Sequence, residues 1–414
     1  MISAAPRADY TFIDRWRIGV LQFLLIVGLL RLTNFNYYLS KLVGFETVVN
    51  STGGNAFNFV NYFGAGVLFA FLISKLHTFR ARWQSLWPYL LLLLIYVFNA
   101  LVAQFVNMTW VLYQILFLGV GALVHVLVLS KRSIDRAFWE DSLGGFYRFS
   151  LLFMGFVLIQ ILTHVSVTAY IESFNDSFVQ SLDDFGIMKQ RYGFLIGFVL
   201  SYALFLERSP ILKWVGIGLV VLTGFGIRSF VLGLVGAGLI FSLRDMKRLV
   251  VFAGGMCLAF ILFLSRYFEL LIYDTRFYSF LNGYDIVQKF PFGVGLGGYP
   301  VYTELNARAI LGSIYNVRAV LDFVPIAPES DLVHLFGSLG LVCGALHLLV
   351  QFRIVWYSLR WQGLFGPFQK AILFYFCYMT FFGISEDNIF SINYWIFFGV
   401  ATGVVSAAAK GYKY

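Results

Sequence analysis

The feature of this sequence that most restricts its fold is a series of apolar runs, each close to the length that crosses a membrane. A spanning helix needs about 20 mostly apolar residues. Runs of this kind lie near 16–32, 56–74, 86–105, 109–129, 148–168, 192–206, 211–227, 229–243, 248–265, 332–351, 368–384 and 388–408. They predict an all-α fold: a polytopic integral membrane protein of about 12 transmembrane helices, forming a single domain over residues 1–414.

The scarcity of charge supports the same fold class. Only 12% of the 414 residues are charged and 60% are hydrophobic, whereas soluble domains carry about 25% charged residues. A chain this apolar has too little polar surface to fold as a soluble protein, so we expect lipid to be the solvent for most of it.

The distribution of Lys and Arg predicts the topology. Cytoplasmic connections of membrane proteins are rich in these residues. If both termini are cytoplasmic, 20 of the 30 basic residues fall in cytoplasmic segments. Acidic residues divide as 7 inside and 14 outside, so the inner side carries +13, the outer side −4, and the two sum to the net charge of +9. The positive charge is therefore a topology signal, and we expect no nucleic-acid partner.

This topology places one large extracytoplasmic loop between helices 9 and 10, at residues 266–331, and a shorter outer segment at 169–191. Long loops in compact membrane proteins usually carry function. The large loop opens with YDTRFYSFLNGYD, which is typical of an amphipathic stretch lying on the membrane. Within it, Asp274, Arg276 and Asp285 could form surface ion pairs that contribute little.

Arginines on the predicted outer side are candidate anion ligands. Arg191 stands at the mouth of the sixth helix, Arg228 lies between two apolar helices, and Arg276 opens the large loop. Guanidinium groups bind phosphate through paired donors, so converging arginines would suit a diphosphate. For Arg228 the alternative is a side chain that only extends to the membrane interface.

The segment FPFGVGLGGYP is a second candidate. It places Gly293, Gly295, Gly297 and Gly298 between two prolines. Glycine permits positive φ and close backbone approach, as a phosphate cradle requires. An ordinary irregular loop has the same composition, and the chain contains no Walker-type GKS or GKT sequence.

The third candidate is the start of the tenth helix. Ser330 and Asp331 could simply cap this helix. The functional alternative makes Glu329 a general base at the membrane surface, with His334 one turn later to orient it or to bind substrate. A single His on an apolar helix is more often a packed residue. No metal-ligand spacing occurs among the histidines, so no metal site is expected.

These segments, in this order, resemble the bacterial O-antigen ligase and O-antigen polymerase superfamily of membrane glycosyltransferases. The matching parts lie within about 190–350: GIRSFVLGLVGAGLIF, Arg276 before a loop-opening helix, KFPFGVGLGGYP and ESDLVHLFGSLG. Ligases of that family typically carry His-Asn where this chain has Glu329-Ser330. This departure favours a polysaccharide polymerase over a ligase.

The resemblance implies an activity at the outer face of the bacterial inner membrane: joining undecaprenyl-diphosphate-linked oligosaccharide repeat units into an exopolysaccharide, capsule or O-antigen. It implies that Arg191, Arg228, Arg276, Gly295 and Gly297 bind the diphosphate. The implied catalytic residues are Glu329, Arg276 and His334. No nucleotide, metal or other cofactor is required, because the diphosphate is already an activated leaving group. The implied partners are the lipid-linked oligosaccharide, membrane lipid, a chain-length regulator and a flippase.

Transport is the main alternative. A 12-helix transporter or a flippase for lipid-linked oligosaccharide would have a similar helix count. Twelve-helix facilitators usually have their longest loop between helices 6 and 7, where this chain has only residues 207–210. A flippase would need a cationic central cavity, whereas the candidate cations here lie at the outer face. A glycosyltransferase that uses polyprenyl-phosphate sugars is a third possibility, but the first outer loop offers it only Glu46.

Overall fold

The structure, a computed structural model, describes residues 85–129, 136–164, 189–224, 228–243, 275–303, 330–361, 363, 365–384 and 389–409. All regular secondary structure in these ranges is helical, and no strand occurs among them. The main helices are α5 (Trp87–Val102), α6 (Met108–Leu129), α7 (Arg136–His164), α10 (Lys189–Phe205), α11 (Pro210–Gly224), α12 (Arg228–Ser242), α14 (Thr275–Lys289), α16 (Asp331–Trp361), α17 (Pro367–Phe382) and α18 (Ile392–Ala409).

The all-α prediction is confirmed for this part of the chain. Nine of the predicted apolar runs overlap a described helix, and the runs near 16–32, 56–74 and 248–265 lie outside the described residues. Two stretches, Met108–Val126 and Asp331–Trp361, are long and apolar enough to cross a membrane. The loop-opening stretch after Asp274 forms the helix α14.

Two helices extend beyond the apolar runs that predicted them. α7 begins at Arg136, twelve residues before its run, and α16 continues to Trp361, ten residues after its run. Hydropathy marks the part of a helix that suits an apolar environment. It does not mark the end of the helix, which depends on caps and on tertiary contacts.

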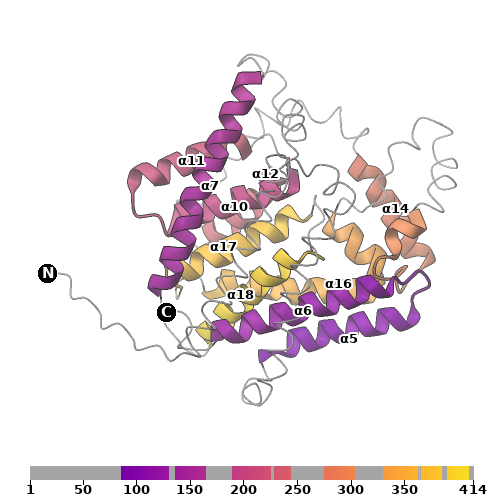
Figure 1. Cartoon of the computed structure of the whole chain (residues 1–414). Coiled ribbons are helices and arrows are strands. Elements are labelled where there is room, and N and C mark those ends of the chain that lie inside the picture. Colours follow the sequence, from indigo (N-terminus) through magenta and orange to yellow (C-terminus); the bar gives the residue numbers. More distant parts are fainter. Residues whose placement is uncertain are drawn as a thin grey trace, which may run out of the picture.

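The helices form one packed bundle in which α5, α6, α16 and α18 run alongside one another (Figure 1). The pairs with the most extensive contact are α6 with α18 and α12 with α17, and α10 packs against both α11 and α17. α14 lies beside one end of this group and packs on α16.

Glycines allow the closest of these helices to approach each other. A side chain on Gly121 of α6 would lie 2.9 Å from the Trp395 carbonyl oxygen of α18, and one on Gly403 of α18 would lie 2.6 Å from Cβ of Val128. Gly193 and Gly197 of α10 similarly receive the rings of Phe382 and Tyr378 from α17. Small residues spaced four apart are the usual means by which helices pack in lipid, where apolar burial gives no driving force.

The outside of the bundle is apolar while its inside contains bonded polar groups. Large apolar side chains are strongly exposed, including Leu101 at 80%, Leu152 at 76% and Ile211 at 74%. Inside, the Tyr96 hydroxyl lies 2.9 Å from Nε2 of His347 and the Thr402 hydroxyl lies 2.8 Å from Nδ1 of His125. Exposed apolar side chains around an interior whose polar groups are hydrogen-bonded are typical of helices packed in a membrane.

Candidate functional site at one end of the bundle

Three segments that the sequence analysis singled out meet at one end of the bundle. They are α14, the glycine segment (residues 290–300) and the start of α16. α14 packs directly on α16 (Figure 1). The glycine segment follows α14 without a break and lies against the first three turns of α16 through backbone hydrogen bonds.

α16 is interrupted at Gly340, and the glycine segment fills the interruption. Gly340 has φ 76° and ψ 178°, which breaks the helical bonding pattern. The freed Gly337 and Ser338 carbonyls accept the amides of Val294 and Gly295 at 2.9 and 3.0 Å. In return the Leu341 amide donates to the carbonyl of Pro291 at 3.0 Å. Buried backbone groups must find a partner, so the helix break and the loop each require the other.

Positive φ angles explain the glycines of this segment. Gly293, Gly295 and Gly297 have φ of 79°, 107° and 72°. A side chain on Gly295 would lie 2.8 Å from Val106, and one on Gly297 would lie 2.8 Å from the indole of Trp110. These glycines therefore use the positive φ and the close backbone approach that the residue permits. The groups that lie close to these two glycines belong to the α5–α6 link and the start of α6. Diphosphate binding by Gly295 and Gly297 stays a prediction.

Asn99 of α5 connects the two sides of this junction. Its amide nitrogen donates to the carbonyls of Phe292 and Ser338, each at 3.0 Å, and its amide oxygen accepts the Leu296 amide at 3.1 Å. The side chain is 1% exposed. One residue thus joins α5, the glycine segment and the broken helix. The sequence analysis missed it, although a lone Asn in an apolar run is itself a sign of a specific polar contact.

The link between α5 and α6 holds the glycine segment from the same side. The amides of Phe105 and Asn107 donate to the carbonyls of Val294 and Leu296 at 2.9 and 3.0 Å. The hairpin formed by α5, residues 103–107 and α6 is therefore a wall of this end of the bundle. The N-terminal half of the chain contributes to the site, which its generic sequence did not indicate.

The start of α16 is tied to the link between α17 and α18. The Ser330 hydroxyl accepts the Leu332 amide at 3.2 Å, as a helix cap does, and donates to the Ile384 carbonyl at 2.7 Å. The buried Asp331 carboxylate accepts the Ile389 amide at 2.6 Å. The predicted capping role of Ser330 is confirmed, while Asp331 instead anchors a neighbouring link. Glu329 lies outside the described residues.

His334 lies one turn into α16 and is buried, with 4% of its surface exposed. Its ring packs edge-on against Phe390 from the link before α18, with centroids 4.4 Å apart, and against Trp110 from α6 at 6.3 Å. The aromatic surroundings fit the packed-residue interpretation. A role of His334 in catalysis stays a prediction.

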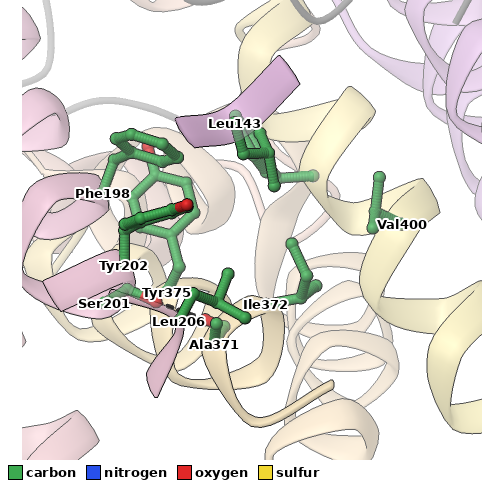
Figure 2. A pocket seen from close by; sticks show the side chains of 10 residues that line it. Leu143, Phe198, Ser201, Tyr202, Leu206, Ala371, Ile372, Tyr375 and Val400 are labelled. Atoms are coloured by element: carbon green, nitrogen blue, oxygen red, sulfur yellow. Dashed lines mark hydrogen bonds between the residues drawn. The ribbon is translucent and has the colours of Figure 1, made fainter. Parts of the chain in front are cut away.

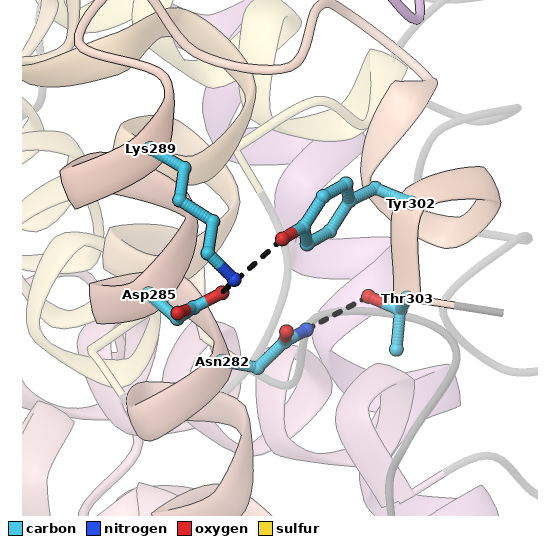
Figure 3. Close-up of polar contacts among 5 residues, drawn as sticks. All are labelled: Asn282, Asp285, Lys289, Tyr302 and Thr303. Carbon is cyan, nitrogen blue, oxygen red and sulfur yellow. Dashed lines mark hydrogen bonds and ion pairs between the residues drawn. The ribbon is translucent and has the colours of Figure 1, made fainter. Parts of the chain in front are cut away.

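A polar network fixes α14 to the end of the glycine segment and to the residues that follow it (Figure 3). The Asn282 amide donates to the hydroxyls of Tyr299 and Thr303 at 3.0 and 2.8 Å. Lys289 forms an ion pair of 2.8 Å with Asp285, one turn earlier on the same helix. The ion-pair partner of Asp285 in the structure is therefore Lys289.

The charge of this pair affects two ionisable groups. The hydrogen bond that Lys289 donates to Asp285 raises the pKa of Lys289 above its ordinary value. Tyr302 donates its hydroxyl to Asp285 at 3.1 Å, and burial, with the Asp285 charge in addition, raises the pKa of Tyr302. Both groups therefore keep their protons at neutral pH.

The arginines are placed only by their helices. Arg191 lies in the first turn of α10, Arg228 is the first residue of α12, and Arg276 is the second residue of α14. Their side chains lie outside what the structure describes. Convergence of the three on one diphosphate therefore stays a prediction.

The described cavities lie away from His334 and the glycine segment. One, of about 20 Å³, is lined mostly by apolar and aromatic side chains that include Phe198, Ile372 and Tyr375 (Figure 2). It has room for a water molecule only. Another, of about 350 Å³, is lined by Arg148, Glu207 and Arg208 among others. Among the described residues, no group of three or more His, Cys, Asp or Glu side chains could hold a metal ion.

Comparison with known proteins adds no assignment: no protein-family model matches the chain, and no curated protein matches its sequence.

Proposed function

We propose that this protein is a membrane glycosyltransferase, a polymerase that joins undecaprenyl-diphosphate-linked oligosaccharide repeat units at the outer face of the bacterial inner membrane. The observation that carries the proposal is the meeting of α14, the glycine segment and the start of α16. These are the segments in which the sequence resembles O-antigen polymerases and ligases. They are joined here by backbone hydrogen bonds between Val294 and Gly337 and between Gly295 and Ser338.

The packing also supports the proposed topology of about 12 spans with both termini cytoplasmic. Segments expected on the outer side contact one another: the α5–α6 link bonds the glycine segment, and the α17–α18 link bonds the start of α16. Positions expected on the cytoplasmic side also meet, because the Arg353 guanidinium lies 4.6 Å from the Trp87 ring centroid. Helices that cross the membrane in alternating directions would bring outer links together at one end of the bundle and cytoplasmic links together at the other.

Cysteine accessibility tests this topology. In a cysteine-free background, a cysteine in place of Asn107 should react with a membrane-impermeant thiol reagent applied to spheroplasts. A cysteine in place of Ser209 should react only after the membrane is opened. Both positions lie in links between helices. The reverse pattern of labelling would contradict the proposed orientation.

The proposed reaction transfers a growing glycan to a new repeat unit. The bond between the anomeric carbon and the diphosphate breaks, and undecaprenyl diphosphate leaves with the bonding electron pair. A hydroxyl of the acceptor sugar forms the new bond to that carbon, and Glu329 accepts its proton. Arg191, Arg228 and Arg276 stabilise the charge that develops on the diphosphate, where electrostatic stabilisation contributes most. His334 orients Glu329 or the acceptor.

The length distribution of surface glycan in a strain lacking the gene tests the proposal. Loss of the long-chain ladder, with single repeat units still exported, is the result expected for a polymerase. Long chains left on the lipid carrier would indicate a ligase. Repeat units trapped on the cytoplasmic side would indicate a flippase, and the catalytic assignments would then be wrong.

Substitutions in the same strain test the residues. Arg276→Ala and Glu329→Ala should each abolish polymer while the protein stays in the membrane. Lys289→Ala is the matched control, because it removes a cation from the same helix as Arg276 and its side chain is 52% exposed. Full activity of either test variant would remove that residue from the mechanism.

A further inference from the structure

Trp110 is a large aromatic side chain at the candidate site that the protein covers only in part. It lies in the first turn of α6, and 39% of its surface is exposed. No motif of the sequence drew attention to it. The question is whether its exposed surface faces lipid, as tryptophans at membrane interfaces do, or the candidate site.

Helix geometry places Trp110 on the inner face of α6. Met108 and Leu112 are 62% and 65% exposed and mark the outer face. Successive residues turn by about 100°, so Trp110 lies on the opposite side of the helix from both. Val111 and Gln114, which share the inner face, are 4% and 0% exposed. The exposed indole therefore belongs to the interior stripe, at the end of the helix where that stripe opens.

Two elements of the candidate site hold the ring. A side chain on Gly297 would lie 2.8 Å from Cγ of Trp110, so this glycine allows the indole to lie on the glycine segment. The His334 ring is 6.3 Å away in an edge-to-face arrangement. The Asn107 amide oxygen accepts the backbone amides of Thr109 and Trp110, which fixes the first turn of α6.

This arrangement suits a sugar ring. The face of an aromatic ring carries partial negative charge, and a pyranose presents partially positive C–H groups on its faces and hydroxyl groups around its edge. Here the indole N–H can donate to a hydroxyl group. An isoprenoid chain would instead favour the outer face that bears the exposed apolar side chains of Met108 and Leu112.

We propose that Trp110 is a substrate-binding residue that stacks against a sugar ring of the lipid-linked repeat unit beside His334. This inference rests on the proposed function, because it names the part of the substrate that the same site holds. It assigns the α5–α6 hairpin a direct role in binding the substrate, in addition to supporting the glycine segment.

Binding to the purified full-length protein in detergent tests the inference without requiring catalysis. The first probe is the repeat-unit oligosaccharide released from its lipid carrier by mild acid, and the second is undecaprenyl monophosphate. Trp110→Ala should raise the Kd for the oligosaccharide about tenfold, within the range of single aromatic contacts. Trp110→Phe, which keeps a ring face, should raise it less than about threefold. The Kd for undecaprenyl monophosphate should not change in either variant.

Trp214→Ala is the matched control, since Trp214 is 69% exposed on α11 and has no place in the candidate site. Its Kd values should equal those of the wild type. Indole emission provides a second measurement that does not depend on the stability of the alanine variant. Oligosaccharide should change the emission of the wild type and leave that of Trp110→Phe unchanged.

The outcomes separate this inference from the proposed function. If Trp110→Ala and Trp110→Phe both bind the oligosaccharide with the same Kd as the wild type, the sugar-stacking role is overturned and the polymerase proposal still stands. A loss of undecaprenyl monophosphate binding in Trp110→Ala would mean that the ring contacts the lipid instead. No binding of either probe to the wild type would contradict the proposed function itself.

Discussion

Replacing Asn99 should destabilise the protein strongly, because three hydrogen bonds at the junction depend on this one buried side chain. Asn99→Leu places an apolar side chain of similar size in α5 and removes all three hydrogen bonds of the amide. The carbonyl of Phe292 and the amide of Leu296 then lose this partner, while the Ser338 carbonyl still accepts the Gly295 amide. Because Asn99 is 1% exposed, water cannot replace it without opening the junction.

The size of the effect follows from the number of bonds. A hydrogen bond to a buried group contributes about 1 kcal/mol, and leaving a buried group without a partner costs about 1–3 kcal/mol. Some relaxation of the loop is expected, so we expect Asn99→Leu to lower the free energy of unfolding by about 3–5 kcal/mol. Asn99→Asp should be at least as costly, because its carboxylate would face two carbonyl oxygens.

Gln114→Leu is the matched control. Gln114 is also buried in a helix of the same hairpin, and its amide nitrogen donates to a single carbonyl, that of Phe390, at 3.0 Å. We expect it to cost about 1–2 kcal/mol. Both variants would be unfolded reversibly by a detergent titration of the purified protein. If Asn99→Leu cost no more than Gln114→Leu, Asn99 would not hold the glycine segment to α16.

Two further predictions concern the same junction. Gly340→Ala should prevent folding or severely lower the yield of folded protein, because φ at this position is 76° and a side chain would overlap the backbone of residues 291–293. Gly155→Ala is the control and should be neutral, because a side chain there would meet nothing within 4 Å. Size-exclusion chromatography of the two variants compares their yields of folded protein. The Lys289–Asp285 pair should contribute less than about 1 kcal/mol, since Lys289 is half exposed. The pKa of Lys289 is raised above its ordinary value of 10.5, so this contribution is fully present below pH 10.5 and is lost as the pH rises through the higher pKa of the folded state. Asp285→Asn and the wild type should therefore converge in stability at high pH. A difference in stability that stays constant with pH would refute the ion-pair origin.

The helices were predictable because the length and hydropathy of a spanning segment are local properties. The interruption of α16 was not, since residues 332–351 form a continuous apolar run. Gly340 adopts positive φ because Pro291 and Gly293 approach it from a distant part of the chain. Such a contact has no local signature beyond the glycine itself.

The candidate site was predictable only in part. The glycine segment and the start of α16 were identified from composition and from resemblance to a family. Their contact with the α5–α6 hairpin was missed, because Asn99 and Trp110 stand in runs that look like generic membrane helices. The pairs Gly193–Gly197 and Gly399–Gly403 show that a helix-packing pattern was present in the sequence.

Reconstitution tests the central claim most directly. The purified protein would be placed in liposomes with undecaprenyl-diphosphate-linked repeat units as the sole substrate, with no nucleotide and no divalent cation. The account predicts a ladder of glycans in multiples of one repeat unit, still attached to lipid, with release of undecaprenyl diphosphate. Folded protein that leaves the repeat units unjoined, or that only moves them across the bilayer, would contradict it.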